Sequence, residues 1–508
     1  MSVDAPRPAS LWIACVLCKL LIFALAGRQY GYLSDELYFM DAARHLDLGY
    51  VDFPPMIAWV IALTEATIGT DLLVLRGIAV AAGIAVTLLA VETARQLGGG
   101  RLAQWITGIV VLFAPAFLSV QSILTMNVLD QLWWTLGFWL LVQYLNTGRA
   151  SLMLWLGLVY GLALLTKLSL PFWFAGMVVA TALFRRDLVR VPETWAAIVI
   201  MLIIAAPFFY WQISNNWPFL AFITAYADST PEAMVINQPV FGLVATMNPP
   251  FALIWLPGLI YGLLFARGSA RFLATAATVC LVLFLAAGVK FYFATPLFVI
   301  FTALGAILWE RWLAGKAWLR RGVIATLVFS GLTSVPIGAP VLPPDQLQAL
   351  VNFMRDGEQG YGSDEPAPLG RYFPHFAEMG GWVELVDAVT DQYLSIPGGE
   401  RANVTLLAAY YGQAGALNQL DRGNQLPTAY SGHMNYGRWW EQADLSNVLA
   451  VGYDLALLQD LYEQVEVVAS FSCERCMARE NGLLIVRAQS PRLAPDTIRA
   501  RLVRLSFF

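Results

Sequence analysis

The fold of this chain is decided near its N-terminus by two short stretches, SDELY at residues 34–38 and GYVDFPPM at residues 49–56. They lie in a polar loop that follows the first hydrophobic segment, and Asp52 comes sixteen residues after Glu36. The segments on both sides of this loop are apolar. An acid pair at the surface of a membrane needs a reason, because every nearby segment is built to avoid water.

Composition places the rest of the chain in a membrane. The 508 residues are 58% hydrophobic and 13% charged, with a mean hydropathy of +0.62, and several runs approach the ~18–20 apolar residues that cross a bilayer. The sequence therefore predicts a polytopic α-helical membrane protein with about eleven transmembrane helices, although hydropathy alone fits a transporter equally well. Eleven apolar runs lie at residues 10–26, 72–93, 102–119, 128–145, 151–166, 170–184, 194–213, 249–266, 272–289, 292–309 and 322–339.

The distribution of charge orients these segments. If the N-terminus is cytoplasmic, thirteen Lys and Arg residues lie in the inner loops and five at the outer ends, which follows the positive-inside rule. An odd number of crossings then places the C-terminal part outside the cytoplasm. Residues 1–339 carry a net charge of +4 and residues 340–508 a net charge of −8, and an acidic outer part argues against nucleic-acid binding because it would repel phosphates.

Two parts are expected along the chain. Residues 1–340 form a membrane domain with outer loops at 27–70 and 215–248, the second of which is expected to be irregular. In the first loop, Ser34 is expected to cap a helix over 35–47, and an amphipathic helix follows over 56–68. Residues 341–508 are expected to form an extracytoplasmic α/β domain. Its predicted strands are 404–409, 447–451, 465–471 and 483–486, and its predicted helices are 351–355 and 455–464.

The three acids of the first loop are the first candidates for chemistry. Asp35 and Glu36 occupy the first turn of a predicted helix, where acids are favoured by the helix dipole without any further function. The alternative is that they combine with Asp52 as a catalytic base and as ligands of a divalent metal ion. For Asp52, the simpler interpretation is a turn residue before Pro54-Pro55.

Two lysines interrupt apolar sequence near outer helix ends. Lys290 either extends to the membrane interface or binds a phosphate near the outer leaflet, with the hydroxyl of Tyr292 as a second donor. Lys167 is expected to act as an interfacial anchor. Asn127 and Asp130 lie at the outer mouth of another segment, where Asn127 is expected to cap the helix and Asp130 to have a partner.

The five cysteines divide into two groups. Cys15, Cys18 and Cys280 lie in apolar segments and are expected to be packing residues. Cys473 and Cys476 lie in the outer part, where a local disulfide is the simplest expectation. A redox-active pair remains an alternative, and two ligands are too few for structural zinc.

The acid pair and the acid-X-Pro-Pro turn resemble membrane glycosyltransferases of the family-39 type. This family includes dolichyl-phosphate-mannose protein mannosyltransferases, aminoarabinose lipid A transferases and their galacturonosyltransferase relatives. The resemblance extends over nearly the whole chain. Further matching positions are Met126-Asn127, Trp211-Gln212, Asn216-Trp217-Pro218, Lys290-Phe291-Tyr292, Pro296, Tyr411 to Ala416, Leu426-Pro427 and Ser431-Gly432-His433.

The resemblance implies a GT-C fold and assigns roles to some of these residues. Asp35 matches the proposed catalytic base, and Asp52 matches an acidic residue that organises the site or binds metal. Lys290 matches a basic residue near the donor phosphate. In the aminoarabinose transferases the acid before Pro-Pro is Glu followed by Lys, whereas here Phe53 follows Asp52. This departure argues against aminoarabinose as the sugar.

The expected function is transfer of a sugar from a polyprenyl-phosphate donor to a lipid, glycan or protein acceptor, with inversion at the anomeric carbon. It would take place at the outer face of a bacterial cytoplasmic membrane. One alternative is a transporter or flippase of lipid-linked saccharides, which would be expected to show related halves with paired broken helices. A second alternative is an inactive member whose outer domain binds a partner or a glycan.

Overall fold

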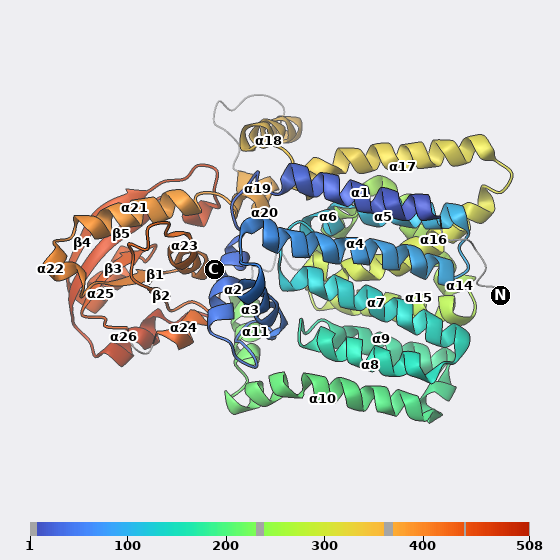
Figure 1. Cartoon of the computed structure of the whole chain (residues 1–508), viewed down its shortest axis with the longest axis horizontal. Helices are drawn as coiled ribbons and strands as arrows, with labels where there is room; N and C mark the ends of the chain where they lie inside the picture. Colours follow the sequence, from blue (N-terminus) through green and yellow to red (C-terminus); the bar gives the residue numbers. More distant parts are fainter. Residues whose placement is uncertain (1–7, 230–237, 360–368, 441–442, 507–508) are drawn as a thin grey trace.

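A computed structural model of the chain describes residues 8–229, 238–359, 369–440 and 443–506. Long helices run side by side through one part of the molecule, and a sheet with its own helices forms the other part (Figure 1). Helices α2 (Ser34–Arg44) and α3 (Met56–Thr67) lie between the two parts. The first outer loop therefore joins the membrane helices to the C-terminal α/β region.

The apolar runs predicted from the sequence are helical. In the described residues, six helices are long and apolar enough to cross a membrane, and the exact number of crossings stays a prediction. The helices of this part are α1 (Ala9–Ala26), α4 (Leu72–Gln96), α5 (Arg101–Phe113), α6 (Pro115–Val120), α7 (Met126–Thr147), α8 (Ala150–Leu164), α9 (Leu170–Phe184), η1 (Arg186–Arg190), α10 (Pro192–Ser214), η2 (Pro249–Phe251), α14 (Ala252–Leu264), α15 (Gly268–Ala286), η3 (Phe291–Leu297), α16 (Phe298–Trp312) and α17 (Ala317–Gly338).

Two of these runs are not continuous helices. The run at 102–119 breaks at Ala114, whose backbone is extended, because a residue before proline disfavours the helical conformation. The run at 292–309 begins as the 3₁₀ helix η3, which contains Pro296, and only then continues as α16. Tyr292 therefore lies in a short irregular turn at the end of the bundle.

Small residues allow the membrane helices to approach closely. A side chain at Gly258 of α14 would come within 1.9 Å of the Phe301 carbonyl oxygen on α16. At Gly176 of α9, it would meet the Ala276 carbonyl oxygen on α15 at 2.2 Å. Helix pairs in lipid pack through such positions, because water expulsion does not drive their association.

The first outer loop folds nearly as predicted, with one correction. Ser34 does not cap α2, because the helix begins at Ser34 itself and the preceding residue, Leu33, is the cap. The Glu36 side chain takes over the capping function by accepting the Leu33 amide at 2.9 Å. Helix α3 covers the predicted amphipathic segment.

The second outer loop, 215–248, is more regular than predicted. Its described residues form α11 (Pro218–Ser229) and α13 (Gln238–Thr246), and residues 230–237 lie outside the described part. Within the described part of this loop, the irregular backbone lies at the joins. Asn216, Trp217 and Asn248 there have φ values of 61°, 55° and 64°.

The C-terminal region is an α/β domain built on a mixed sheet. In the strand order β2-β1-β3-β5-β4, β1 is parallel to β2 and β3, and β5 is antiparallel to β3 and β4. The prediction missed β2 and extended one helix to Gln464, whereas that helix ends at Leu461 because β4 begins at Tyr462. The elements are α18 (Pro344–Gln359), α19 (Leu369–Tyr372), α20 (Pro374–Ala377), α21 (Trp382–Ser395), α22 (Gly398–Arg401), β1 (Thr405–Ala408), α23 (Tyr411–Leu420), β2 (Ala429–Ser431), α24 (Tyr436–Trp439), β3 (Asn447–Val451), α25 (Leu455–Leu461), β4 (Tyr462–Phe471), η4 (Ala478–Glu480), β5 (Leu483–Pro491) and α26 (Pro495–Leu502).

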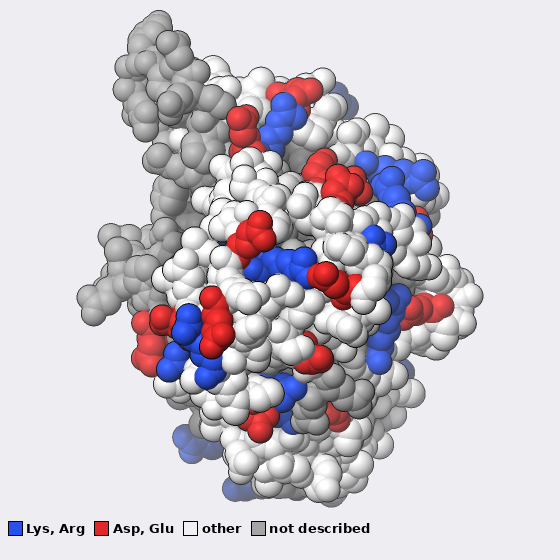
Figure 2. Space-filling view, turned by 90° about the vertical axis from the view of Figure 1, so that its left-hand side faces the viewer, with Lys and Arg blue, Asp and Glu red and all other residues white. Residues whose placement is uncertain are grey.

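This domain, called the outer domain below, shares a hydrophobic core with α2 and α3. Leu37 and Ile57 from the two loop helices pack in one cluster with Leu385 of α21 and Ala414 of α23, and all four are at most 1% exposed. The face of the molecule at the outer-domain end carries acidic and basic side chains interspersed (Figure 2). The outer domain thus packs apolar side chains against α2 and α3, whereas the charged face at its far end is suited to water.

Candidate active site

Asp35 lies in the first turn of α2 and is partly exposed. Its Oδ1 accepts a hydrogen bond of 2.7 Å from the hydroxyl of Tyr411, which begins α23 of the outer domain. Among the described residues, no hydrogen bond is made to Oδ2. One oxygen of Asp35 is therefore held by the outer domain, and the other is available to a substrate.

Glu36 has a different environment from its neighbour. It is fully buried, and its two oxygens accept the amides of Leu33 at 2.9 Å and Leu124 at 3.0 Å. Both carboxylates are catalytic candidates by sequence, but the structure separates them. Glu36 ties the start of α2 to the turn before α7, which leaves Asp35 as the accessible carboxylate.

Asp52 is held by one residue from each domain. Its Oδ1 accepts hydrogen bonds of 2.8 Å from the Tyr38 hydroxyl and 2.8 Å from the Asn435 amide nitrogen. Burial raises the pKa of Asp52 to about 7, the hydrogen bond from Tyr38 opposes this shift, and the nearby Asp35 charge adds to it. Near neutral pH the protonated and ionised forms of Asp52 are therefore both populated, and its surroundings decide the balance between them.

A metal ion at Asp52 finds few protein ligands. Within the described residues, no three side chains of His, Cys, Asp or Glu gather closely enough to hold a metal. A divalent ion coordinated by Asp52 would have to complete its shell with water or substrate oxygens, as Mg²⁺ often does. The metal role of Asp52 stays a prediction.

Lys290 and Tyr292 lie near enough to Asp35 to interact with it electrostatically. Lys290 is exposed and precedes η3, and it interacts electrostatically with Tyr292, Asp35 and Glu378. Its Nζ is 5.5 Å from the ring centroid of Tyr226 on α11. The structure thus places a cation and a phenol at the end of the bundle next to the outer domain, close to the candidate base.

Lys167 is part of this site, which corrects the prediction that it is an interfacial anchor. The residue is only 5% exposed, and its Nζ donates to Asn127 Oδ1 at 2.7 Å. The same Nζ lies 5.0 Å from the ring centroid of Tyr292 and 3.3 Å from that of Phe293. The sequence shows only a lysine at a helix end, so nothing in it indicated this inward direction.

Asn127 and Asp130 support Lys167. The side chain of Thr125, not that of Asn127, caps α7, and Asn127 is thereby free to bind the lysine. Asp130 is buried and accepts hydrogen bonds of 3.0 Å from both Ser169 and the Trp134 indole. It also interacts electrostatically with Lys167. This confirms the expectation that Asp130 has a partner.

The outer domain adds charged residues that the sequence did not single out. Arg479 pairs with Glu378 at 2.6 Å and with Glu480 at 3.2 Å, and it donates to the Tyr410 hydroxyl at 2.9 Å. Burial raises the pKa of Glu378, and the Arg479 charge opposes that shift. These residues belong to distant segments, and only the fold brings them to Asp35.

The disulfide joins Cys473 and Cys476 in the turn between β4 and β5. The turn packs against Gly381, which has a φ of 78°, and a side chain at Gly381 would come within 2.3 Å of the Cys476 sulfur. The disulfide therefore lies beside the segment that carries Glu378. Of the remaining cysteines, Cys15 and Cys280 are buried, as expected for packing residues.

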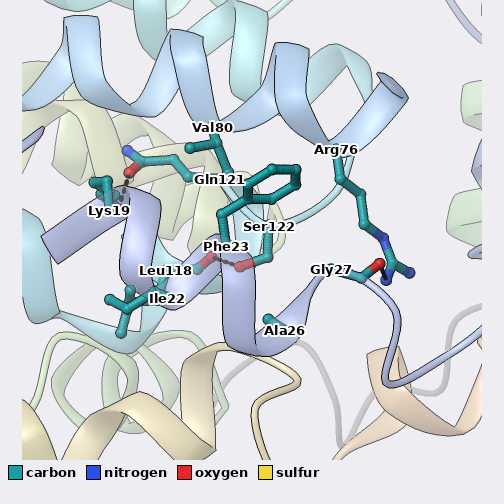
Figure 3. Close-up of a pocket in the computed structure, with 10 residues that line it drawn as sticks. All are labelled: Lys19, Ile22, Phe23, Ala26, Gly27, Arg76, Val80, Leu118, Gln121 and Ser122. Carbon is teal, nitrogen blue, oxygen red and sulfur yellow. Dashed lines mark hydrogen bonds between the residues drawn. The ribbon is translucent and has the colours of Figure 1, made fainter. Parts of the chain in front are cut away.

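A small pocket between α1, α4 and α6 contains two further cations (Figure 3). Lys19 donates to Gln121 at 2.6 Å. Arg76 donates to the carbonyl oxygens of Gly27 at 3.0 Å and Gly31 at 2.6 Å. Arg76 therefore fastens the chain that leaves α1 to α4, and its task is structural.

A helical membrane bundle with a two-helix outer loop beneath an α/β domain is the architecture of the GT-C membrane glycosyltransferases. The structure of ArnT from Cupriavidus metallidurans bound to undecaprenyl phosphate matches with a TM-score of 0.61 at 16% identity, over 95% of this chain and 98% of that chain. The oligosaccharyltransferase AglB from Archaeoglobus fulgidus, in complex with an inhibitory peptide and a dolichol-phosphate, matches with a TM-score of 0.53 at 12% identity. That match covers 87% of this chain and 69% of that chain. At these identities the matches show the fold.

The sequence comparisons agree with this class. Residues 52–211 match the family described as dolichyl-phosphate-mannose-protein mannosyltransferase. The lipid A galacturonosyltransferase RgtD of Rhizobium johnstonii is 29% identical over 192 residues, which are 36% of this chain and 39% of that protein. The chain therefore matches about two fifths of the length of this curated relative. Together these matches confirm the resemblance to the family-39-type membrane glycosyltransferases and the GT-C fold.

Proposed function

We propose that this protein transfers a sugar from a polyprenyl-phosphate donor to a lipid, glycan or protein acceptor at the outer face of a bacterial cytoplasmic membrane. The observation that carries the proposal is the placement of Asp35, with one oxygen available, beside Lys290 at the outer end of the helices. A polyprenyl-phosphate donor needs this arrangement, because its tail lies in the bilayer and its sugar phosphate lies at the surface.

The residues of the site divide the reaction between them. Asp35 takes the proton of an acceptor hydroxyl, and the oxygen of that hydroxyl attacks the anomeric carbon from the face opposite the phosphate. The bond between the anomeric carbon and the phosphate oxygen breaks, so that the configuration inverts and the electron pair leaves with the polyprenyl phosphate. Lys290, Lys167 and the Tyr292 hydroxyl are positioned to balance the charge on that phosphate. Stabilisation of developing charge is usually the largest contribution to such catalysis, and base catalysis adds roughly 10²–10⁴-fold.

The names of the similar proteins support the same donor and leave the acceptor open. One similar structure was solved with undecaprenyl phosphate and another with a dolichol-phosphate and a peptide. The curated relative acts on lipid A. Both of these structures contain a polyprenyl-type phosphate, whereas the peptide and lipid A differ, so the acceptor class has to be measured.

The test compares a deletion strain with strains that carry the wild-type protein or Asp35→Asn. Mass spectrometry of total lipids, lipid A and envelope glycans should show one sugar missing from the deletion strain and accumulated as its polyprenyl-phosphate donor. Wild type should restore it. The Asp35→Asn protein should be produced normally and should not restore it, because the amide cannot accept the proton.

Glu65→Gln is a matched control, because Glu65 is an acid of the same loop that pairs with Arg44 at 3.1 Å on the surface. This variant should restore the sugar. Transfer by Asp35→Asn at the wild-type rate would remove Asp35 as the base. If the glycans of the deletion strain are unchanged although the parent strain demonstrably produces the protein, the result would favour transport or binding.

A further inference from the structure

The outer domain reaches Asp35 and Asp52 with the carboxyl ends of two parallel strands. Strand β1 runs to Ala408 and is followed by Tyr411, and strand β2 runs to Ser431 and is followed by Asn435. The order β2-β1-β3 places β1 between its two parallel neighbours, so the chain passes from β1 to β2 on one side and then crosses to β3 on the other. In parallel α/β sheets this point is where ligands usually bind. Here it is occupied by α2 of the membrane domain.

The ring of Tyr411 is held by two stacked rings. It stacks on Tyr38 with ring centroids 4.6 Å apart, and on His433 at 5.3 Å with an interplanar angle of 6°. Tyr411 is only 4% exposed. Its hydroxyl therefore has little freedom, and packing alone determines where the hydrogen bond to Asp35 is made.

Tyr410, the residue before Tyr411, is tied to a cation. Arg479 donates to the Tyr410 hydroxyl at 2.9 Å and pairs with Glu378 at 2.6 Å. The rings of Tyr410 and Tyr411 lie 4.3 Å apart at their centroids. The residue before Tyr411 is therefore also fixed, which further limits how far the Tyr411 ring can move.

Two glycines allow α23 to approach α2 closely enough for this contact. A side chain at Gly412 would lie 3.0 Å from Ser34 Cβ, and one at Gly415 would lie 2.9 Å from Leu37 Cβ. Both glycines belong to the stretch that begins at Tyr411, which the proposed function does not otherwise explain. They let the tyrosine at the start of the helix reach the acid at the start of α2.

We propose that Tyr411 is a positioning residue for sugar transfer, supplied by the outer domain, which holds Asp35 Oδ1 so that Oδ2 faces the acceptor hydroxyl. This inference rests on the proposed function. It makes the outer domain a part of the catalytic apparatus in addition to any part it has in binding the acceptor. Asn435 does the same for Asp52 through its 2.8 Å hydrogen bond.

The test is Tyr411→Phe in the purified full-length protein, with transfer measured over a range of pH. A hydrogen bond to a charged group contributes about 1.5–3 kcal/mol, so kcat should fall about 10- to 100-fold while KM for the donor changes little. The acid limb of the kcat profile should move to higher pH, because the variant lacks a donor that favours the ionised carboxylate. A purely structural role for Tyr411 would not move that limb.

Two further variants make the result decisive. Tyr462→Phe is the matched control, because Tyr462 is a buried tyrosine of the same domain whose hydroxyl has no hydrogen-bond partner among the described residues. Its kcat and pH profile should equal those of wild type. Tyr410→Phe removes only the hydroxyl that accepts from Arg479, so it should change kcat and the acid limb less than Tyr411→Phe does.

The outcomes separate this inference from the proposed function. A wild-type kcat and pH profile for Tyr411→Phe, with Asp35→Asn inactive, would overturn the positioning role and leave the transferase intact. A folded wild-type protein that transfers no sugar from any polyprenyl-phosphate donor would overturn the proposed function itself. If Tyr411→Phe does not fold, Gly412→Ala decides, because its added methyl group would lie 3.0 Å from Ser34 Cβ and move Tyr411 away from Asp35. An unshifted pH profile for that variant would count against the inference.

Discussion

Asp52 shows how two domains can control the charge of one residue. Tyr38 and Asn435 both donate to the same oxygen of Asp52, and burial nevertheless raises its pKa to about 7. A carboxyl group in an unfolded chain ionises near pH 4. The pKa of Asp52 is therefore higher in the folded protein than in the unfolded chain. This difference makes the free energy of unfolding depend on pH.

We predict that wild type loses stability relative to Asp52→Asn as the pH rises from about 4 to about 7. A folded-state pKa above the unfolded value means that the contribution of Asp52 is complete below pH 4 and is lost as the pH passes through about 7. Asn keeps an acceptor oxygen for Tyr38 but does not ionise. Because Asp52 is partly exposed, we expect a difference of about 1–2 kcal/mol. Thermal unfolding of both proteins in detergent at several pH values measures it, and parallel curves would contradict the prediction.

Charged residues between apolar segments were easy to find by sequence, and their partners were not. Asp35, Asp52 and Lys290 stood out because each is a charge next to membrane sequence. Tyr411 did not, because its hydrogen bond to Asp35 spans 376 residues and no local pattern encodes such a contact. Lys167 was identified but misjudged, since a lysine at a helix end looks the same whether it points to the interface or into the site.

Among the elements, α23 connects the outer domain to the site, and its position is narrowly restricted by its neighbours. It follows β1, begins with the positioning tyrosine and packs against α2 through Gly415. The predictions recovered the longer strands of this domain because alternation and β-branched residues mark them. They missed β2 (Ala429–Ser431), because three residues are too few to show a period. Short elements that depend on their neighbours are beyond sequence patterns.

We predict that Gly415→Ala weakens the docking of the outer domain. The added methyl group would lie 2.9 Å from Leu37 Cβ and 3.1 Å from the Leu37 carbonyl carbon, so α23 must move away from α2. Overpacking of this kind costs about 1–3 kcal/mol. Transfer activity should fall, and limited proteolysis should cleave between the two domains at lower protease concentration.

Gly399→Ala is the control for this prediction, because nothing lies within 4 Å of the added atom. It should behave as wild type in both assays. Alanine favours a helix interior over glycine by about 1 kcal/mol, so the outer domain itself should not be destabilised by Gly415→Ala. Unchanged activity and proteolysis of Gly415→Ala would show that α23 and α2 tolerate a wider separation.

At the scale of the whole molecule, the candidate active site lies where two kinds of fold meet. The helices are suited to lipid, since residues such as Ile203 and Phe329 are apolar and more than 60% exposed. The outer domain presents mixed charges to water at its end of the molecule (Figure 2). A donor with a lipid tail and a polar sugar has to be handled at that boundary, and α2 carries Asp35 there. The outward orientation of this end is so far predicted only by the distribution of basic residues.

We predict that the outer domain faces away from the cytoplasm, and single cysteines can show this. Asp496 is 96% exposed in the outer domain, whereas Lys316 is exposed in the loop between α16 and α17, at the other end of the bundle. A membrane-impermeant maleimide should label Asp496→Cys in right-side-out spheroplasts and label Lys316→Cys only after lysis. The wild-type chain is the control and should not be labelled, because the free Cys15, Cys18 and Cys280 lie in apolar helices and Cys473 and Cys476 are joined in a disulfide. Labelling in the reverse order would put Asp35 on the cytoplasmic side. Transfer would then have to use donors before they cross the membrane, and the proposed site of the reaction would be wrong even if its chemistry were right.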